Sequence, residues 1–192
     1  MKNYTLFAVT AAIVISLAVG AYAGPIIQTQ HDWGWQIYCF SPTGQTFTAE
    51  DPRVSIGFWI EDWNQGSGPI ALAIDLRQGA GIGGTLLGSG PIPGLSPGFV
   101  GFYDVDFSSV PLIAGQPYTA IITSTSARGG VFGTGSDVYP GGAVIWLGNV
   151  TTDQESAFRV LPILPIIPAP GALILGGIGV GLAGWLRRRR TI

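Results

Sequence analysis

The sequence predicts an all-β body built as a two-sheet antiparallel sandwich, and three observations support this prediction. The chain of 192 residues contains 30 glycines and 14 prolines and is 10% charged, a composition rich in turn formers. Between residues 28 and 161, apolar residues alternate with polar or small ones in many short runs, as in strands with one buried face. Glycine- and proline-rich clusters separate these runs. We therefore expect about nine strands and no internal helix.

The predicted strands follow the runs of alternating residues. The run from 54 to 60 is the clearest, because every second residue is a large apolar one. The full set of predicted strands is 36–40, 46–49, 54–60, 70–76, 85–88, 103–107, 118–125, 143–148 and 157–161. The predicted turns between them are 64–69, 79–84, 91–94, 128–130 and 140–142.

The first 23 residues have the layout of a secretory signal peptide. Lys2 precedes an apolar run from 6 to 19, and Ala21 and Ala23 flank Tyr22. A positive start, an apolar core and an A-x-A site are typical of a signal that is cleaved. We expect the secretion machinery to export the chain and signal peptidase to cut after Ala23. The alternative is an uncleaved membrane helix.

A second apolar segment lies near the C-terminus. Residues 171–185 carry no charge, and Arg187, Arg188, Arg189 and Arg190 follow Leu186. A helix over 171–186 would be about 24 Å long, enough for a thin bilayer. An arginine at the bilayer centre costs roughly 3 kcal/mol, so the four arginines should stay on the cytoplasmic side. Residues 171–192 are thus predicted to form a transmembrane helix and a cytoplasmic stop.

Pro168, Ala169 and Pro170 stand directly before this apolar segment. Roughly the last 25 residues closely resemble the PEP-CTERM sorting signal, which combines a Pro-Glu-Pro-like tripeptide, an apolar helix and a run of arginines. Ala169 departs from the glutamate that the family usually has. Residues 162–170 would then be a proline-rich tether that carries the tripeptide. A plain single-span anchor is the alternative, and it would leave the tripeptide unexplained.

The resemblance implies a partner and a route. Exosortase, a membrane-embedded transpeptidase, would recognise the signal and cut near the tripeptide. The implied source is a Gram-negative, often biofilm-forming bacterium. The exported protein would be held transiently in the inner membrane, then released or attached at the cell surface or in extracellular polysaccharide.

The body resembles a second, looser family. The strand motifs run in order from GQTFTA at 44–49 to ESAFRV at 155–160. This order is similar to that of exported β-sandwich modules related to jelly-roll and galactose-binding-like domains. The resemblance covers most of residues 44–160 and brings no catalytic residues or cofactor. The β-sandwich body as a whole is expected to span residues 24–161.

The net charge of the body limits which classes of partner it can bind. Between the two terminal segments the chain has four arginines and all eleven acidic residues, a formal net charge of −7. Such a surface repels phosphate groups, so nucleic acid is excluded as a partner. The surface would suit solvated material or cations, and exopolysaccharide is kept as a candidate partner.

Residue types for catalysis are scarce. His31 is the only histidine and Cys39 the only cysteine, so a zinc site is not expected. A His31–Cys39 dyad is conceivable, but a surface histidine is the favoured interpretation. Cys39 is expected to be a buried apolar thiol, with pairing between chains as the alternative.

Carboxylates and tryptophans remain as candidates. Asp104 and Asp106 share a strand face and could contribute to a calcium site, although a solvated face is favoured. A glycosidase pair stays open, and no feature singles one out. Trp59 and Trp63 are the candidate ligand-binding residues, because Trp59 lies opposite the apolar face of 54–60 and could stack on a sugar. Packing against loops is the favoured alternative.

Three functions follow. The leading expectation is a noncatalytic exported surface or extracellular-matrix protein sorted by its tail. The alternative is a carbohydrate-binding module that uses Trp59 and Trp63. A small surface hydrolase is the least favoured.

Overall fold

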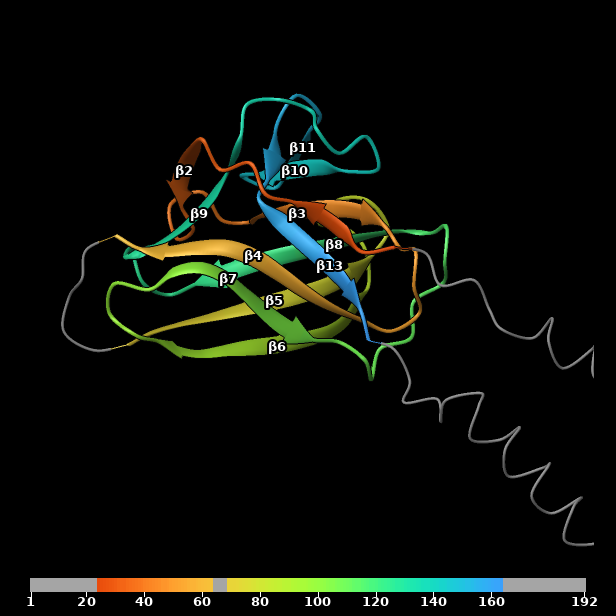
Figure 1. Cartoon of the computed structure of the whole chain (residues 1–192), viewed down its shortest axis with the longest axis horizontal. Helices are drawn as coiled ribbons and strands as arrows, with labels where there is room; N and C mark the ends of the chain where they lie inside the picture. The colour runs from red at the N-terminus through yellow and green to blue at the C-terminus, as the bar shows by residue number, and fades with distance from the viewer. Residues whose placement is uncertain (1–23, 64–68, 164–192) are drawn as a thin grey trace, which may run out of the picture. The chain divides into compact units, whose positions relative to one another are not determined.

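A computed structural model describes residues 24–63 and 69–163, which fold into two antiparallel sheets that pack as a sandwich (Figure 1). These residues contain no helix, which confirms the predicted all-β class and the two-sheet arrangement. Accordingly, no helix within the described ranges is long and apolar enough to cross a membrane. The predicted signal peptide and transmembrane helix lie outside these ranges.

Sheet A has seven strands. Its main path runs through β1 (Ile26–Gln28), β13 (Phe158–Pro162), β4 (Val54–Asp62), β9 (Gly129–Thr134) and β12 (Glu155–Ser156). Two further strands join it: β2 (Trp33–Gln36) pairs with β9, and β7 (Val100–Asp106) pairs with β4. Strand β4 therefore has β13 and β7 as neighbours over much of its length.

Sheet B has six strands in the order β11 (Asn149–Thr151), β10 (Ala143–Trp146), β3 (Thr43–Thr48), β8 (Pro117–Ser124), β5 (Ile70–Gln78) and β6 (Leu86–Leu95). The consecutive strands β4 and β5 belong to different sheets, so the chain crosses the sandwich between them. Strands β6 and β11 are the two edges of this sheet.

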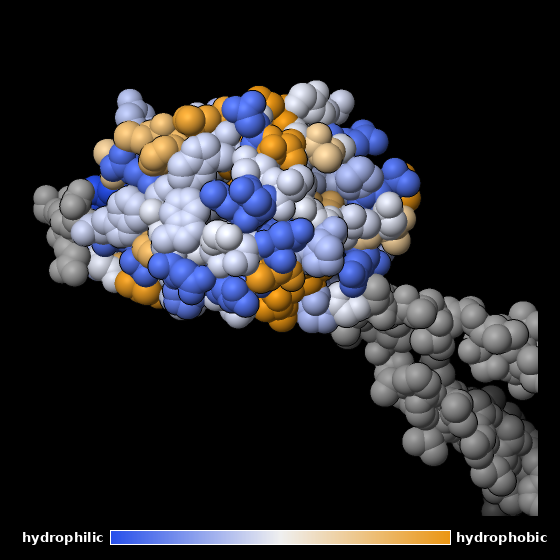
Figure 2. Space-filling view, turned by 90° about the horizontal axis from the view of Figure 1, so that it is seen from above, coloured by the Kyte–Doolittle hydropathy of each residue, from blue (hydrophilic) through white to orange (hydrophobic). Residues whose placement is uncertain are grey.

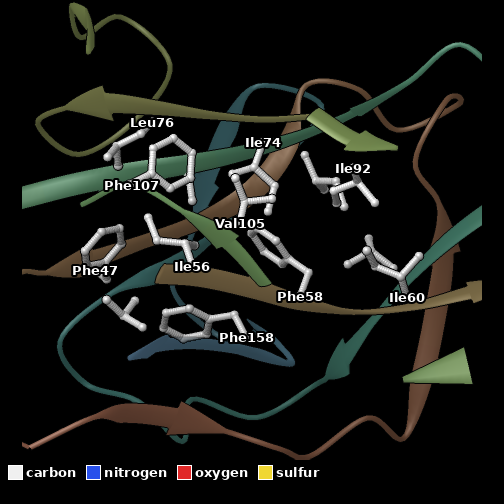
Figure 3. Packing of buried hydrophobic residues seen from close by; sticks show 14 of the residues in the cluster. Phe47, Ile56, Phe58, Ile60, Ile74, Leu76, Ile92, Val105, Phe107 and Phe158 are labelled. Carbon is white, nitrogen blue, oxygen red and sulfur yellow. The ribbon is translucent and has the colours of Figure 1, made fainter. Parts of the chain in front are cut away.

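The inner faces of the two sheets form one apolar core (Figure 3). In β4 the inward residues are Val54, Ile56, Phe58 and Ile60, none more than 1% exposed, as the alternation predicts. Ile74 of β5 packs into the same core from sheet B. Removing a fully buried ring such as that of Phe58 costs about 3–5 kcal/mol, so this core holds the sheets together.

Three of the predicted elements are wrong for identifiable reasons. The strand expected at 36–40 is a turn after β2, where the Phe40 N–H donates to the Gln36 carbonyl over 3.1 Å. The turn expected at 91–94 lies inside β6. Proline is tolerated there because β6 is an edge strand, where a missing N–H breaks fewer ladder bonds.

The glycines at 129 and 130 were expected to form a turn and instead begin β9. A Cβ at Gly130 would lie 2.3 Å from the indole of Trp63. Glycine is required here because an aromatic ring covers the strand, so the reason is close packing rather than a reversal of the chain. Short strands were also missed, and the described residues contain thirteen strands instead of about nine.

The first compact unit of the chain ends at Pro162, where β13 also ends. The sandwich therefore ends at the first residue of the predicted proline-rich tether, before the tripeptide.

Candidate functional site

The outer face of sheet A carries an ion pair that crosses a strand. Gly57 of β4 lies between Arg159 of β13 and Asp104 of β7 in the strand register. Arg159 Nε donates to Asp104 Oδ1 over 2.7 Å, and Arg159 Nη2 donates to Oδ2. A Cβ at Gly57 would lie 2.2 Å from Asp104 Oδ1. The absence of a side chain at Gly57 therefore gives this bidentate pair its place on the sheet.

Trp59 lies next to this ion pair on the same outer face. Its strand neighbour Phe102 meets it edge to face, with ring centroids 5.3 Å apart. The guanidinium carbon of Arg159 lies 4.5 Å from the centre of the Phe102 ring, a cation–π distance. The indole N–H of Trp59 donates to Glu61 Oε1 over 3.4 Å. Aromatic and charged groups are thus interleaved on this face.

His31 covers part of Trp59. The two rings are stacked, with centroids 4.2 Å apart and planes 19° from parallel. His31 is exposed, and its Nδ1 lies 2.7 Å from the Thr29 carbonyl oxygen. We call the set of His31, Trp59 and Phe102 the aromatic surface. Trp59 itself is half-buried, so packing and ligand stacking are both compatible with its position.

Trp63 has a different set of neighbours. It is 39% exposed at the end of β4, where its indole lies over Gly130 and meets the Phe132 ring edge to face at 5.9 Å. The adjacent Asp62 is buried and accepts hydrogen bonds from Arg128 Nε over 3.0 Å and from the Gly98 N–H over 3.0 Å. This ion pair fastens the β4 end to neighbouring loops, so the surroundings of Trp63 are structural.

Three other tryptophans pack on one another instead of forming an exposed platform. Trp33, Trp35 and Trp146 have centroids 4.8 to 5.5 Å apart, and Phe40 lies 4.4 Å from Trp146. On the face drawn in Figure 2, apolar residues lie in small separate groups among hydrophilic ones. The described residues visible there form no single broad apolar surface.

Glu155 is the most perturbed acid of the described residues. It is fully buried on β12, and Gln45 of the opposite sheet donates to its Oε2. Its Oε1 has no hydrogen-bond partner within the described residues. Burial raises its pKa from the usual 4.5 to about 8, with a further rise from the charge of Asp137 and an opposing effect of the Gln45 bond. Glu155 is therefore mostly protonated at neutral pH.

The histidine and the cysteine have separate partners. His31 stacks on Trp59, whereas the Cys39 thiol donates to Gln36 Oε1. Cys39 is exposed, so the expectation of a buried thiol is wrong. The turn at 37–40 explains the difference, because it directs Ile37 into the core and leaves Cys39 outside.

The two aspartates of β7 bind different partners within the protein. Asp104 binds Arg159, and Asp106 Oδ1 accepts a hydrogen bond from the Ser108 N–H over 2.7 Å, which lowers the pKa of Asp106. Across residues 24–63 and 69–163, no group of three or more His, Cys, Asp or Glu side chains is placed to hold a metal ion.

Sequence reasoning missed the Arg159–Asp104 pair and the buried Glu155. The pair had a signal, since both residues lie on outward positions and a glycine lies on the strand between them. Glu155 had none, because nothing in its local pattern distinguishes a buried acid from an exposed one. No protein-family model and no curated protein matches the chain.

Proposed function

We propose that this chain is a noncatalytic exported protein of the cell surface or extracellular matrix, sorted by a PEP-CTERM-type signal that exosortase processes. The observation that carries the proposal is the fixed order of Pro168–Ala169–Pro170, an uncharged run at 171–185 and Arg187–Arg190. A plain membrane anchor needs the apolar run and the arginines but not the prolines.

The body is compatible with this route. Strand β13 ends at Pro162, and residues 163–167 separate it from the tripeptide. Cleavage after Ala23 would leave the body intact, because the first described strand begins at Ile26. Cleavage near the tripeptide would likewise fall outside every strand of the sandwich.

Two ion pairs on the body have structural roles, which supports a noncatalytic function. Arg159 with Asp104 and Arg128 with Asp62 are each engaged in a bidentate pair. We further propose that the sandwich is jelly-roll-like or galactose-binding-like, as the order of its strand motifs implies. Folds of this kind host many functions, so the fold alone names no ligand.

Processing is tested by intact-mass analysis of the exported protein in an exosortase-positive host and in the same host without exosortase. With exosortase, we expect a mature form that begins near Gly24 and lacks residues beyond about Pro170. Without it, the form should retain Arg187–Arg190. An exported product that keeps the arginines in both hosts would refute sorting and leave a plain anchor.

Carbohydrate binding is the second candidate function, and the aromatic surface favours it. Trp59 and Phe102 offer ring faces or edges, and Arg159, Asp104 and Glu61 offer hydrogen-bonding groups beside them. A sugar stacking on Trp59 would have to displace His31. Polysaccharide pull-down that is lost on Trp59→Ala and retained on Trp63→Ala would support this site. Equal binding by both variants and the parent would contradict it.

A further inference from the structure

The outer face of sheet B contains a pocket of about 210 Å³ beside Asp75 and Arg77. Asp75 and Arg77 project from β5, and Ile121 and Thr123 from the neighbouring strand β8. The remaining lining comes from Ser41, Pro42 and Ile82. We call this hollow the Asp75 pocket. It combines an apolar lining with charged and hydroxyl groups, the composition typical of a small-ligand site.

One wall of the pocket is a loop fixed onto the sheet. Arg77 Nη1 donates to the carbonyls of Ile82 and Gly84 over 3.3 and 3.1 Å. The Thr119 hydroxyl donates to the Gly79 carbonyl over 2.7 Å and accepts from the Gly81 N–H over 2.8 Å. These bonds hold residues 79–84 in place. Ile82 therefore lines the pocket even when no ligand is bound.

The opposite wall, which contains Ser41 and Pro42, contacts the same turn as Ile82 does, at Gly148. The Gly148 N–H donates to the Pro42 carbonyl over 2.9 Å. The Ile82 Cδ1 atom lies 3.1 Å from the position of a Cβ at Gly148. Both apolar walls therefore meet the β10–β11 turn, and the pocket is preformed, which reduces the entropy lost on binding.

The two charged side chains of the pocket keep hydrogen-bonding groups that no other part of the described protein engages. Asp75 and Arg77 lie two residues apart on one face of β5, yet they form no ion pair. Within the described residues, the half-buried Asp75 carboxylate accepts no hydrogen bond, and Arg77 uses only Nη1. An acceptor and several donors thus remain available side by side.

A second hollow of about 250 Å³ adjoins the first. Its lining includes Ala71, Ala73, Thr123 and Thr125, and Thr123 borders both hollows. The side chains of Ala71 and Ala73 are small, which leaves the surface between β5 and β8 open. The two hollows together form a track along the strands.

We propose that this track binds a neutral polysaccharide, with one sugar ring in the Asp75 pocket and the next over Ala73 and Thr123. Each hollow is smaller than the roughly 300–1,000 Å³ of a drug-sized site, so each takes one small ring. A carboxylate and a guanidinium side by side can both bond neutral hydroxyls. A charged ligand would meet a like charge in the same pocket.

This inference rests on carbohydrate binding, the second proposed function, and assigns it to the sheet opposite the aromatic surface. The accessibility of the two sites to a ligand agrees with this assignment. Trp59 is partly covered by His31, whereas the Asp75 pocket is open.

The test is native affinity electrophoresis of the exported protein in gels containing dextran, galactomannan or xyloglucan. We expect retardation by at least one of these neutral polymers. Asp75→Asn keeps the size of the side chain and should weaken binding by at least about fivefold, because a hydrogen bond to a charged acceptor is lost. Ala73→Trp should abolish binding by filling the track, and near-ultraviolet circular dichroism checks that this variant is folded.

One control and one comparison variant make the result specific. Asp153→Asn changes the charge equally at an exposed loop residue outside the track and should leave retardation unchanged. Trp59→Ala is the comparison variant, because it changes the aromatic surface and leaves the lining of the track intact. Retardation that survives Asp75→Asn and Ala73→Trp but is lost in Trp59→Ala would overturn the track and leave the aromatic surface as the site.

Gels with alginate or chitosan test the ligand class. Retardation by these charged polymers but by none of the neutral ones would overturn the proposal. Failure to bind any polymer would overturn both carbohydrate sites and leave the sorting proposal, which the intact-mass experiment tests separately.

Discussion

Arg159 and Asp104 meet above Gly57, the residue that stands between them in the three-strand register of β13, β4 and β7. Two side chains from strands that do not pair with each other make a bidentate contact, because the strand between them contributes only backbone at this point. A glycine inside a long central strand, which by itself weakens a sheet, thus has a packing function.

Gly57→Ala should destabilise the fold by about 2 kcal/mol. The new Cβ would lie 2.2 Å from Asp104 Oδ1 and 2.9 Å from the Tyr103 carbonyl oxygen. Movement of the aspartate relieves only the first clash, because the second involves backbone. Urea denaturation measures the loss. Ser55→Ala, at an outward position of the same strand, is the control and should stay within about 0.5 kcal/mol of the parent.

The ion pair itself should contribute a coupling free energy of about 1 kcal/mol. Both side chains are more than a quarter exposed, at 28% and 29%, so solvent weakens their attraction. The bidentate geometry and the contact of Arg159 with Phe102 act in the other direction. A double-mutant cycle with Arg159→Met and Asp104→Asn measures this coupling. A value that is zero at low salt would contradict the assignment.

Glu155 should make the fold less stable as the pH rises through the neutral range. The pKa of its carboxyl group is about 8 in the folded protein and near 4.5 when exposed, so the folded state holds the proton more tightly. Stability from this group is therefore complete below about pH 4.5 and declines until about pH 8. The decline amounts to several kcal/mol at most, at 1.36 kcal/mol per pH unit.

Glu155→Gln should remove this decline, because the amide keeps the shape of the carboxylic acid but does not ionise. The free energy of unfolding, measured by urea titration between pH 5 and pH 9, should fall with pH in the parent and change less in the variant. Asp153→Asn, at an exposed position, should follow the parent curve. Parallel curves for the parent and Glu155→Gln would show that Glu155 ionises normally.

Cys39 should react with a maleimide in the folded protein at nearly the rate seen in denaturant. The thiol is exposed in the turn after β2, and its one hydrogen bond, to Gln36, does not block access. Mass spectrometry of the labelled chain measures the rate. Protection by more than about a hundredfold would show that the 37–40 turn keeps the thiol inside.

The sequence predicted the strands whose burial depends on alternation alone. In β4 and β5 every second side chain enters the core, and the predicted runs fall within the observed strands. The misses occurred where tertiary contacts override local preference. Gly129 and Gly130 have the composition of a turn, and only the ring of Trp63 over Gly130 shows why they belong to a strand.

The candidate sites also combine features that the local sequence predicts with features that only tertiary contacts determine. The outward position of Trp59 follows from the strand period, so it could be predicted, but the stacking of His31 could not, because His31 lies far away along the chain. The Asp75 pocket depends on a loop that folds back onto sheet B and on a turn contributed by β10 and β11. No local pattern links Ser41 and Pro42 with Asp75, so this pocket could not be predicted from the sequence.

The prolines of β6 affect how a second copy of the protein can approach this edge of sheet B. Pro91 and Pro93 lack the N–H groups that an incoming strand would need, and β6 is an edge of sheet B. A neighbouring copy therefore cannot extend the sheet there by continuous backbone pairing. This edge of the sandwich therefore resists the strand-by-strand stacking that builds fibres.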